Sequence, residues 1–286
     1  GFMELLFLGT GAATAFPLPF CSCSVCTAAR KLRGKNLRRR SSLLVDRRLL
    51  IDLGPDSATA AGELGADLSQ VRYLLQTHAH SDHFDPGHLI TRHPDYAGEN
   101  RSPLSIAASG KTLEAMGRRL KGEDPSAELF DPDFQKKLGL SLFPIQDGQA
   151  LCLGEYRVTA LDSGHDPQED ALIFRVEQGR SAFLYGTDLL EISPKGWELL
   201  RERPLDFAIL DQTYGHGVNS GGHLDAGQTA SIAGRMRREG ILKPGGQVYA
   251  THLSHEGNKN HEEAERDAAA NGYRIAFDGL CLRTED

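Results

Sequence analysis

The stretch THAHSDHFD, residues 77–85, limits the possible folds of this chain more than any other segment. It contains three histidines and two aspartates in an H-x-H-x-D-H spacing, directly after the apolar run VRYLLQT. A short loop at the end of a strand can turn several donors toward one point. Imidazole and carboxylate groups suit Zn, Mn or Fe. We therefore predict half of a metal site here, rather than a solvated loop that happens to be rich in histidine.

Further donors close other apolar runs later in the chain. They are His165 in LDSGHD, Asp188 in LYGTD and His252 in VYATH, with His255 as an additional candidate. A single residue of this kind is more often a satisfied polar group than a ligand. If the strands share a sheet, however, the donors meet at the same edge as His78. Asp52, at the end of LLID, either orients a ligand histidine or caps a turn.

Short apolar runs recur along the chain and predict strands. They are MELLFL, SSLLVD, RLLIDLG, VRYLLQT, PLSIAA, YRVTALD, ALIFRV, SAFLYGTD, DFAILDQT and GQVYATH. Amphipathic segments predict helices at residues 56–65, 111–120, 195–201, 226–239 and 261–270. VDRRLLID predicts a hairpin around Arg47 and Arg48.

The domain organisation follows from the absence of a linker-like segment. No Ser/Gly-rich or low-complexity block divides the sequence, so we expect one domain over residues 1–286. Residues 93–137 are polar and contain several prolines and glycines. We expect this stretch to be an insertion or a lid over a site.

Composition and charge limit the classes of partner. A chain of 286 residues with 40% hydrophobic content can bury a substantial core. The net charge of −7 argues against nucleic acid or an anionic membrane as a partner attracted by bulk charge. No apolar run approaches the ~20 residues of a membrane helix. The opening MELLFLG carries Glu4 and is expected to be a strand rather than a secretory signal, so we expect a cytoplasmic protein.

Three of the five cysteines crowd into CSCSVC as Cys21, Cys23 and Cys26. They offer three thiolates, one fewer than a tetrahedral zinc site needs. From the residues alone, the triad could be part of a zinc site or a group of buried thiols. Cys152 and Cys281 stand in apolar, strand-like runs and are expected to be small core residues.

Two further segments are candidates for substrate chemistry. The glycine-rich GHGVNSGGHLDAGQT holds His216 and His223, either of which could protonate a leaving alkoxide or cap the following helix. RKLRGKNLRRR, residues 30–40, carries seven basic residues. It is either a solvated flank or a segment that attracts a phosphorylated substrate. His88 and His261 are expected on the surfaces of helices.

The order H-x-H-x-D-H, His165, Asp188 and His252 resembles the metallo-β-lactamase superfamily. The resemblance implies an α+β fold, an αββα four-layer sandwich with two divalent metals at its edge. The ligands that it implies for one metal are His78, His80 and His165, and those for the other are Asp82, His83 and His252, with Asp188 as a bridge. Asp82 in place of a cysteine is similar to the dinuclear phosphodiesterase branch, in which a metal-bridging hydroxide attacks phosphorus.

The C-x-C-x2-C triad and the later T-H-x-x-H closely resemble one group of that superfamily, the phosphoribosyl 1,2-cyclic phosphate phosphodiesterases (PhnP-like). This resemblance implies a structural zinc on Cys21, Cys23, Cys26 and His255. It also implies that His223, in a G-H-x-D context, is the general acid, with His216 as the reserve. Asp82 and His223 are accordingly the expected catalytic residues.

We therefore expect a metal-dependent hydrolase, a phosphodiesterase that opens a small cyclic or nucleotide-like phosphate with Zn, Mn or Fe in its active site. The alternatives are a tRNA 3′-processing endonuclease-like protein, a relative of the PQQ-biosynthesis B protein, and a lactonase or thioesterase on the same fold. A fourth alternative is a binding module without turnover. The superfamily resemblance also suggests a homodimer.

Overall fold

The computed structural model describes residues 1–99 and 101–285, and its strands form two seven-stranded sheets. In spatial order, the first sheet contains β14 (Cys281–Arg283), β1 (Glu4–Gly9), β2 (Ser42–Val45), β3 (Leu49–Ile51), β4 (Tyr73–Leu75), β5 (Leu104–Ala108) and β6 (Leu140–Pro144). The second contains β13 (Arg274–Ile275), β12 (Leu242–Thr251), β11 (Leu205–Asp211), β10 (Ser181–Gly186), β9 (Leu172–Gln178), β8 (Tyr156–Asp162) and β7 (Ala150–Leu153).

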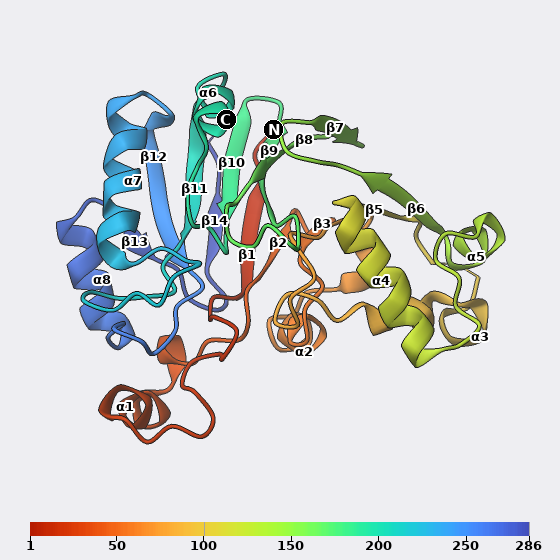
Figure 1. The fold of residues 1–286 in the computed structure, drawn as a ribbon, viewed down its shortest axis with the longest axis horizontal. Helices are drawn as coiled ribbons and strands as arrows, with labels where there is room; N and C mark the ends of the chain where they lie inside the picture. The colour runs from red at the N-terminus through yellow and green to blue at the C-terminus, as the bar shows by residue number, and fades with distance from the viewer. Residues whose placement is uncertain (100, 286) are drawn as a thin grey trace.

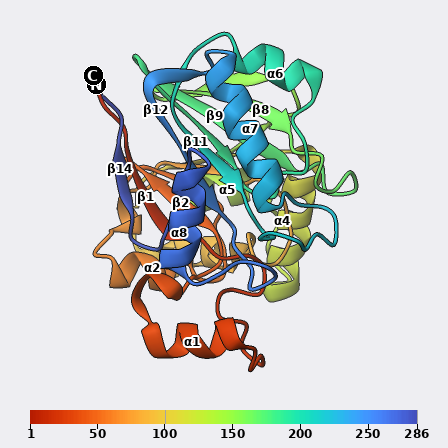
Figure 2. The same ribbon diagram turned by 90° about the vertical axis from the view of Figure 1, so that its left-hand side faces the viewer.

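Helices are distributed along the whole chain. The α-helices are α1 (Ser24–Leu32), α2 (Ser57–Glu63), α3 (Pro94–Ala97), α4 (Gly110–Glu123), α5 (Pro132–Leu138), α6 (Pro194–Leu200), α7 (Ala226–Arg238) and α8 (His261–Ala270). Three 3-10 helices accompany them: η1 (Gly34–Asn36), η2 (Leu68–Gln70) and η3 (Pro86–Arg92). Figures 1 and 2 show α1 set apart from the body of the molecule, below α2 and α8.

The alternation of side chains along each strand builds the layers of the fold. In β1, Leu5 and Phe7 pack into the core between the two sheets, whereas Leu6 and Leu8 pack into a second core on the outer face of the first sheet. Helices α2 and α4 cover that outer face, and α6, α7 and α8 cover the outer face of the second sheet. The predicted αββα four-layer sandwich is therefore confirmed (Figure 1).

The strands that sequence patterning missed are the edge strands of the sheets. All ten predicted strands are present, and the hairpin around Arg47 joins β2 to β3 with Val45 opposite Leu49. The missed strands β6, β7, β13 and β14 lie at the four sheet edges. An edge strand is covered on fewer sides, so β6 and β13 lack a continuous apolar run. Strands β7 and β14 lie in the runs around Cys152 and Cys281, which were described as strand-like but not assigned as strands. The five predicted helices are also present, whereas α1, α3 and α5 were not predicted.

The stretch expected to be an insertion or lid, residues 93–137, contributes α3, β5, α4 and most of α5. Strand β5 pairs in parallel with both β4 and β6, so this part of the stretch belongs to the first sheet. A lid role for the remainder stays a prediction. Residue 100 within this stretch and residue 286 at the end of the expected domain lie outside the described residues.

Three expectations about single side chains were wrong. Cys152 and Cys281 are exposed rather than buried in the core, because they lie on the edge strands β7 and β14 and point outward. His261 is buried rather than exposed, because it opens α8 against Arg38, whose Nη2 lies 3.0 Å from its Nδ1. His88 is exposed on η3 as expected.

Candidate metal centre

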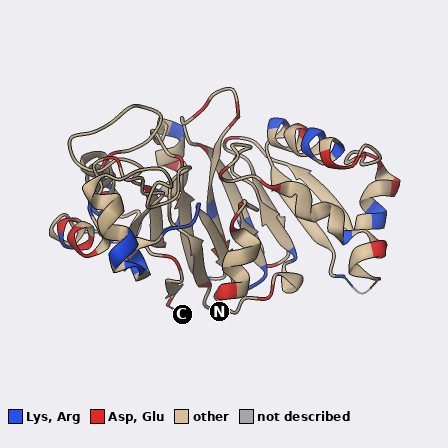
Figure 3. Ribbon diagram, turned by 90° about the horizontal axis from the view of Figure 1, so that it is seen from below, with Lys and Arg blue, Asp and Glu red and all other residues tan. Residues whose placement is uncertain are grey.

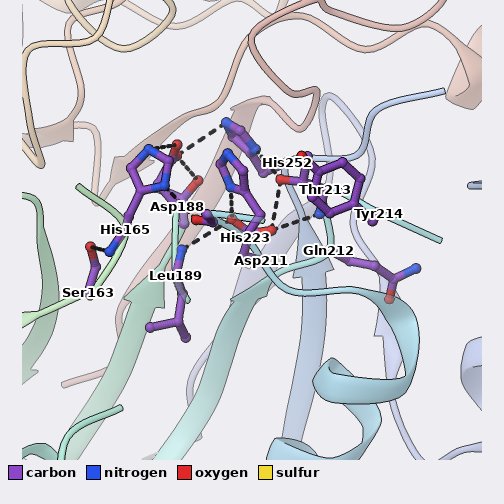
Figure 4. Close-up of polar contacts among 12 residues, drawn as sticks. Ser163, His165, Asp188, Leu189, Asp211, Gln212, Thr213, Tyr214, His223 and His252 are labelled. Carbon is purple, nitrogen blue, oxygen red and sulfur yellow. Dashed lines mark hydrogen bonds and ion pairs between the residues drawn. The ribbon is translucent and has the colours of Figure 1, made fainter. Parts of the chain in front are cut away.

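Four strands from the two sheets deliver their donors to one edge of the sandwich. Strand β4 of the first sheet leads into the loop with His78, while β8, β10 and β12 of the second lead to His165, Asp188 and His252. Strands β10, β11 and β12 are parallel, and β8 runs in the same direction because both it and β10 are antiparallel to β9. Their carboxyl ends therefore meet at a common edge (Figure 4).

The first donor set consists of His78, His80 and His165, whose ligand atoms lie within 4.8 Å of one another. His165 Nε2 is 3.4 Å from Nδ1 of His80. The Nε2 atom of His78 is buried and has no hydrogen-bond partner among the described residues. Because an unsatisfied buried nitrogen is costly, this atom fits a bound cation better than a protein partner.

The second donor set consists of Asp82, His83, His252 and Asp188, all of them buried. Nε2 of His83 lies 3.0 Å from Asp82 Oδ2 and 3.3 Å from His252 Nε2. Asp82 Oδ2 is also 3.3 Å from His252 Nε2. Two imidazoles and two carboxylates at this separation form an N/O donor set suited to a divalent metal.

Asp188 stands between the two sets. Its Oδ1 lies 3.7 Å from His78 Nε2 and 3.4 Å from His165 Nε2. Its Oδ2 lies 2.7 Å from His83 Nε2 and 3.2 Å from His252 Nε2. One carboxylate therefore presents one oxygen to each set.

The second nitrogen of each histidine in the two sets is held by another group. Asp52 Oδ2 is 2.6 Å from His83 Nδ1, and Asp166 Oδ2 is 3.1 Å from His80 Nε2. The remaining contacts are Thr77 Oγ1 to His78 Nδ1 at 2.9 Å, the Gly222 carbonyl to His165 Nδ1 at 2.6 Å, and Thr213 Oγ1 to His252 Nδ1 at 2.8 Å. Such contacts fix the orientation of ligand imidazoles. Of the two roles considered for Asp52, the structure supports the orienting one.

Three residues of the centre have a strained backbone conformation. Asp52, Asp188 and His252 have φ values of 68°, 49° and 61°, in the left-handed region that non-glycine residues rarely adopt. Each of them follows the end of a strand and turns its side chain toward the edge. Strained backbone of this kind persists where the surrounding structure enforces it, often at functional sites.

The charges of the centre compensate one another. Burial lowers the pKa of His78, so its imidazole is neutral and can donate a lone pair. Burial opposes ionisation of Asp82 and Asp188, but neighbouring histidines outweigh it and hold the pKa of both carboxyls below the usual range. Burial also lowers the pKa of His83, but Asp188, Asp82 and Asp52 raise it well above its ordinary value. The carboxylates thus favour a positive charge at this position, which a divalent cation would supply.

His223 lies beside both donor sets. Its Nδ1 is 2.8 Å from Asp211 Oδ2. Its ring stacks on that of His252, with centroids 5.1 Å apart, and lies at a tilt to that of His165, with centroids 4.4 Å apart (Figure 4). Burial lowers the pKa of His223, but the charge and hydrogen bond of Asp211 raise it to about 9. The imidazole is therefore protonated at neutral pH. His216 is exposed and has no recorded contact with either set among the described residues.

Cys21, Cys23, Cys26 and His255 form a separate cluster. The three sulfur atoms lie 3.6, 3.6 and 3.4 Å from His255 Nδ1. A hydrogen bond from the backbone of Cys26, followed by one from the side chain of His255, lowers the pKa of Cys23 to about 6. Burial raises the pKa of Cys26 to about 11. The set has the composition of a Cys₃His zinc site, and a cation there would favour all three thiolates.

A family model described as the β-lactamase superfamily domain matches residues 47–275. The chain belongs to the metallo-β-lactamase superfamily. A solved structure described as a new diphosphatase from the PhnP family is 26% identical, with a TM-score of 0.72, and the match covers 99% of this chain and 98% of that one. Among the curated proteins, no match was found.

Two further solved structures share the superfamily fold. Zinc-bound PqqB from Methylobacterium extorquens is 17% identical, with a TM-score of 0.72, and the match covers 98% of this chain and 99% of that one. The short form of human tRNase Z is 17% identical, with a TM-score of 0.65, over 99% of this chain and 100% of that one. At 17% identity, these two matches show only that the chain shares their fold. In the described part of the chain, no helix has the length and apolar character needed to cross a bilayer.

Several residues around the metal centre were not predicted from the sequence. Asp211 and Thr213 support His223 and His252, and Asp166 contacts His80. Asp211 ends strand β11, so it shares the strand-end position that identified Asp188. That position could have identified it. Asp166 and the Gly222 carbonyl lie in loops, and no sequence pattern indicates their contacts.

The basic run at residues 30–40 is only partly a solvated flank. Figure 3 marks the Lys and Arg positions of the chain in blue. Arg38 is buried and donates to Thr10, Ala276 and His261. Arg39 pairs with Glu63 and Asp278, and Arg30 donates to backbone carbonyls of the loop that precedes α1. Arg40 pairs with Asp56.

Proposed function

We propose that this chain is a dinuclear metal-dependent phosphodiesterase that hydrolyses a small cyclic or nucleotide-like phosphate. The observation that carries the proposal is the position of Asp188, with one carboxylate oxygen facing each of two donor sets. A mononuclear site would not need a carboxylate that serves both sets.

In this proposal, one metal would be held by His78, His80 and His165, and the other by Asp82, His83 and His252. Asp188 would contribute to both sites. The metals would be Zn, Mn or Fe, because imidazole and carboxylate donors accept each of them. When bound, two such ions activate water and stabilise the charge of a phosphate undergoing in-line attack. Cys21, Cys23, Cys26 and His255 would hold a structural zinc.

The chain itself supplies proton transfer and orientation. His223 carries a proton at neutral pH and would donate it to the oxygen of the leaving group, a contribution of roughly 10²- to 10⁴-fold. Asp211 holds the imidazole by its Nδ1, which leaves Nε2 to deliver the proton. Asp82 would act as a catalytic ligand, and Asp52 and Thr213 would keep His83 and His252 oriented.

The similarity to the PhnP-family diphosphatase favours a second candidate function, hydrolysis of a diphosphate linkage. Both reactions require attack of water on phosphorus and protonation of the leaving oxygen. The PqqB-like and tRNase Z-like readings have support from fold alone. A small phosphorylated substrate as the partner, a homodimer and a cytoplasmic location stay predictions.

The test combines metal content with hydrolysis of bis-p-nitrophenyl phosphate by the wild type, His80→Ala and Cys23→Ala. We expect about three metals per wild-type chain, loss of turnover in His80→Ala, and loss of one zinc with most turnover retained in Cys23→Ala. A diphosphate ester assayed in parallel separates the second candidate from the first. Wild-type protein that is loaded with metal but cleaves neither class would refute the proposal and direct attention to lactones and thioesters.

A further inference from the structure

Arg40 lies between the two loops that carry donors of the second set. On one side, Gly11 forms isolated β-bridges with both Arg40 and Leu253, the residue after His252. On the other side, Arg40 binds Asp56. Two residues before Asp56, Gly54 packs so closely on the loop at Asp82 that a Cβ there would lie 2.9 Å from the Asp82 carbonyl oxygen. The backbone of Arg40 and its partner Asp56 therefore lie close to the loops of the second donor set. The hydrogen bond to Asp56 and, to a smaller extent, the charge of Asp82 raise the pKa of Arg40, so Asp82 acts electrostatically on the guanidinium.

Asp56 fixes the orientation of the Arg40 guanidinium and leaves part of it free. Asp56 Oδ2 accepts from Arg40 Nε at 2.8 Å, and Oδ1 accepts from Nη2 at 2.9 Å. Asp56 Oδ2 also accepts from the Arg40 backbone nitrogen at 3.0 Å. The Nη1 atom has no recorded partner among the described residues, and 35% of the side chain is exposed to solvent. A bidentate pair of this kind holds the guanidinium plane in a defined direction.

This arrangement differs from that of the other arginines in the basic run. Arg38 is buried, and Arg39 has carboxylate partners on two sides. Arg40 combines partial exposure, a fixed plane and a position near the loops that carry Asp82 and His252. Arginine with a free edge is well suited to phosphate oxygens, because its planar donors match their geometry.

We infer that Arg40 binds a phosphate oxygen of the substrate through its free Nη1 edge, which places the charged group of the substrate on the Asp82 and His252 side of the centre. The inference rests on the proposed function and narrows its substrate class to molecules whose phosphate reaches this side. The competing explanation is structural: Arg40 would only tie the start of β2 to the loop before α2.

The test measures binding of inorganic phosphate to metal-loaded protein by calorimetry, together with metal content and thermal stability. The variants are Arg40→Gln, Arg40→Lys and Asp56→Asn. Arg48→Gln is the matched control, because Arg48 also pairs with a carboxylate, Glu155, but lies at the hairpin end of β2 and β3. We expect Arg40→Gln to weaken phosphate binding on the order of tenfold or more at unchanged metal content. Arg40→Lys and Asp56→Asn should lose less phosphate affinity than Arg40→Gln, and Arg48→Gln should lose none.

Kinetics with a phosphodiester give an independent readout. A substrate-binding Arg40 predicts that Arg40→Gln raises KM more than it lowers kcat. Unchanged phosphate affinity in Arg40→Gln would overturn the inference, and so would loss of metal or of thermal stability equal to that of Asp56→Asn. If the wild type binds phosphate through Arg40 but hydrolyses no phosphodiester, the inference stands and the proposed function fails. If the wild type is active and Arg40→Gln is indistinguishable from it, the proposed function stands alone.

Discussion

Asp52 is the residue whose single carboxylate organises the second donor set. It is fully buried and accepts hydrogen bonds from the backbone nitrogen and the hydroxyl of Thr77. One of its oxygens, Oδ2, lies 2.6 Å from His83 Nδ1. Burial raises the pKa of Asp52, while the charge and hydrogen bond of His83 oppose that effect. The histidine that Asp52 orients therefore favours the ionised form of Asp52 in return.

Replacing Asp52 should weaken the second metal position more than the first. We expect Asp52→Ala to lower metal affinity there by about 10- to 100-fold, because His83 loses the partner that sets its orientation. A chelator competition titration measures this loss, with Asp67→Asn, at an exposed cap of η2, as the control. Two metals bound with wild-type affinity in Asp52→Ala would show that His83 is held by other contacts.

His261 makes stability depend on pH. Burial, followed by the charge of Arg38, lowers the pKa of His261 to about 4. The unfolded chain binds a proton near pH 6.5, whereas the folded chain does so only near pH 4. Stability from this group is therefore fully present above pH 6.5 and is lost as the pH falls toward 4.

Urea unfolding at pH 7 and pH 4.5 should reveal the titration of His261. Between pH 7 and pH 4.5, we expect the free energy of unfolding to fall on the order of 2 kcal/mol more in the wild type than in His261→Gln. The reason is that glutamine can accept a hydrogen bond from Arg38 but does not titrate. Parallel pH curves for the two proteins would contradict the prediction.

At the scale of elements, the close contact between β1 and the segment entering β2 positions Arg40. Gly9, the last residue of β1, has no side chain because the backbone of Arg40 occupies that space. A Cβ on Gly9 would lie 1.9 Å from the Arg40 carbonyl oxygen. The two strands can meet at the metal edge only with glycine at this position.

Gly9→Ala should force these segments apart. We expect a loss of about 1–3 kcal/mol in the free energy of unfolding, since backbone atoms cannot move aside as a flexible side chain can. Gly122→Ala in α4 is the control, because nothing lies within 4 Å of its Cβ position. It should gain about 0.5–1 kcal/mol. Chemical denaturation of both variants checks the pair, and a neutral Gly9→Ala would show that β1 and β2 can separate without cost.

At the scale of the whole molecule, the donor sets draw on both sheets. His78 and His80 follow a strand of the first sheet, whereas His165, Asp188 and His252 follow strands of the second. Metals bound here would link the two sheets at one edge, where buried carboxylates and imidazoles otherwise compensate only one another. Metal binding should therefore stabilise the fold as a whole.

Chelation should lower the melting temperature reversibly. Metal at 100 times its Kd adds about 2.7 kcal/mol. In a chain of 286 residues, that corresponds to a shift of roughly 4–5 °C. Differential scanning calorimetry with chelator and after metal is returned measures the shift. His216→Gln, which alters an exposed histidine, should behave like the wild type, whereas His165→Ala should respond less. Equal melting temperatures with and without metal would contradict the prediction.

Local sequence patterns predicted the strands buried on both faces and the individual candidate donors, whereas the four-layer arrangement and the two ligand sets were implied by the superfamily resemblance. Apolar runs mark central strands, and His165, Asp188 and His252 stand where such runs end. The superfamily resemblance then linked these positions to one edge. The tertiary structure shows that these residues do gather at that edge.

Features that depend on neighbours distant in the chain are visible only in the folded structure. The four edge strands, the burial of His261 and the exposure of Cys152 and Cys281 result from where the sheets end and which helix covers them. The contacts of Asp211 with His223 and of Arg40 with Asp56 join segments separated in the chain. A local pattern records whether a residue is apolar or polar, but the partner of a polar side chain is set by the path of the whole backbone.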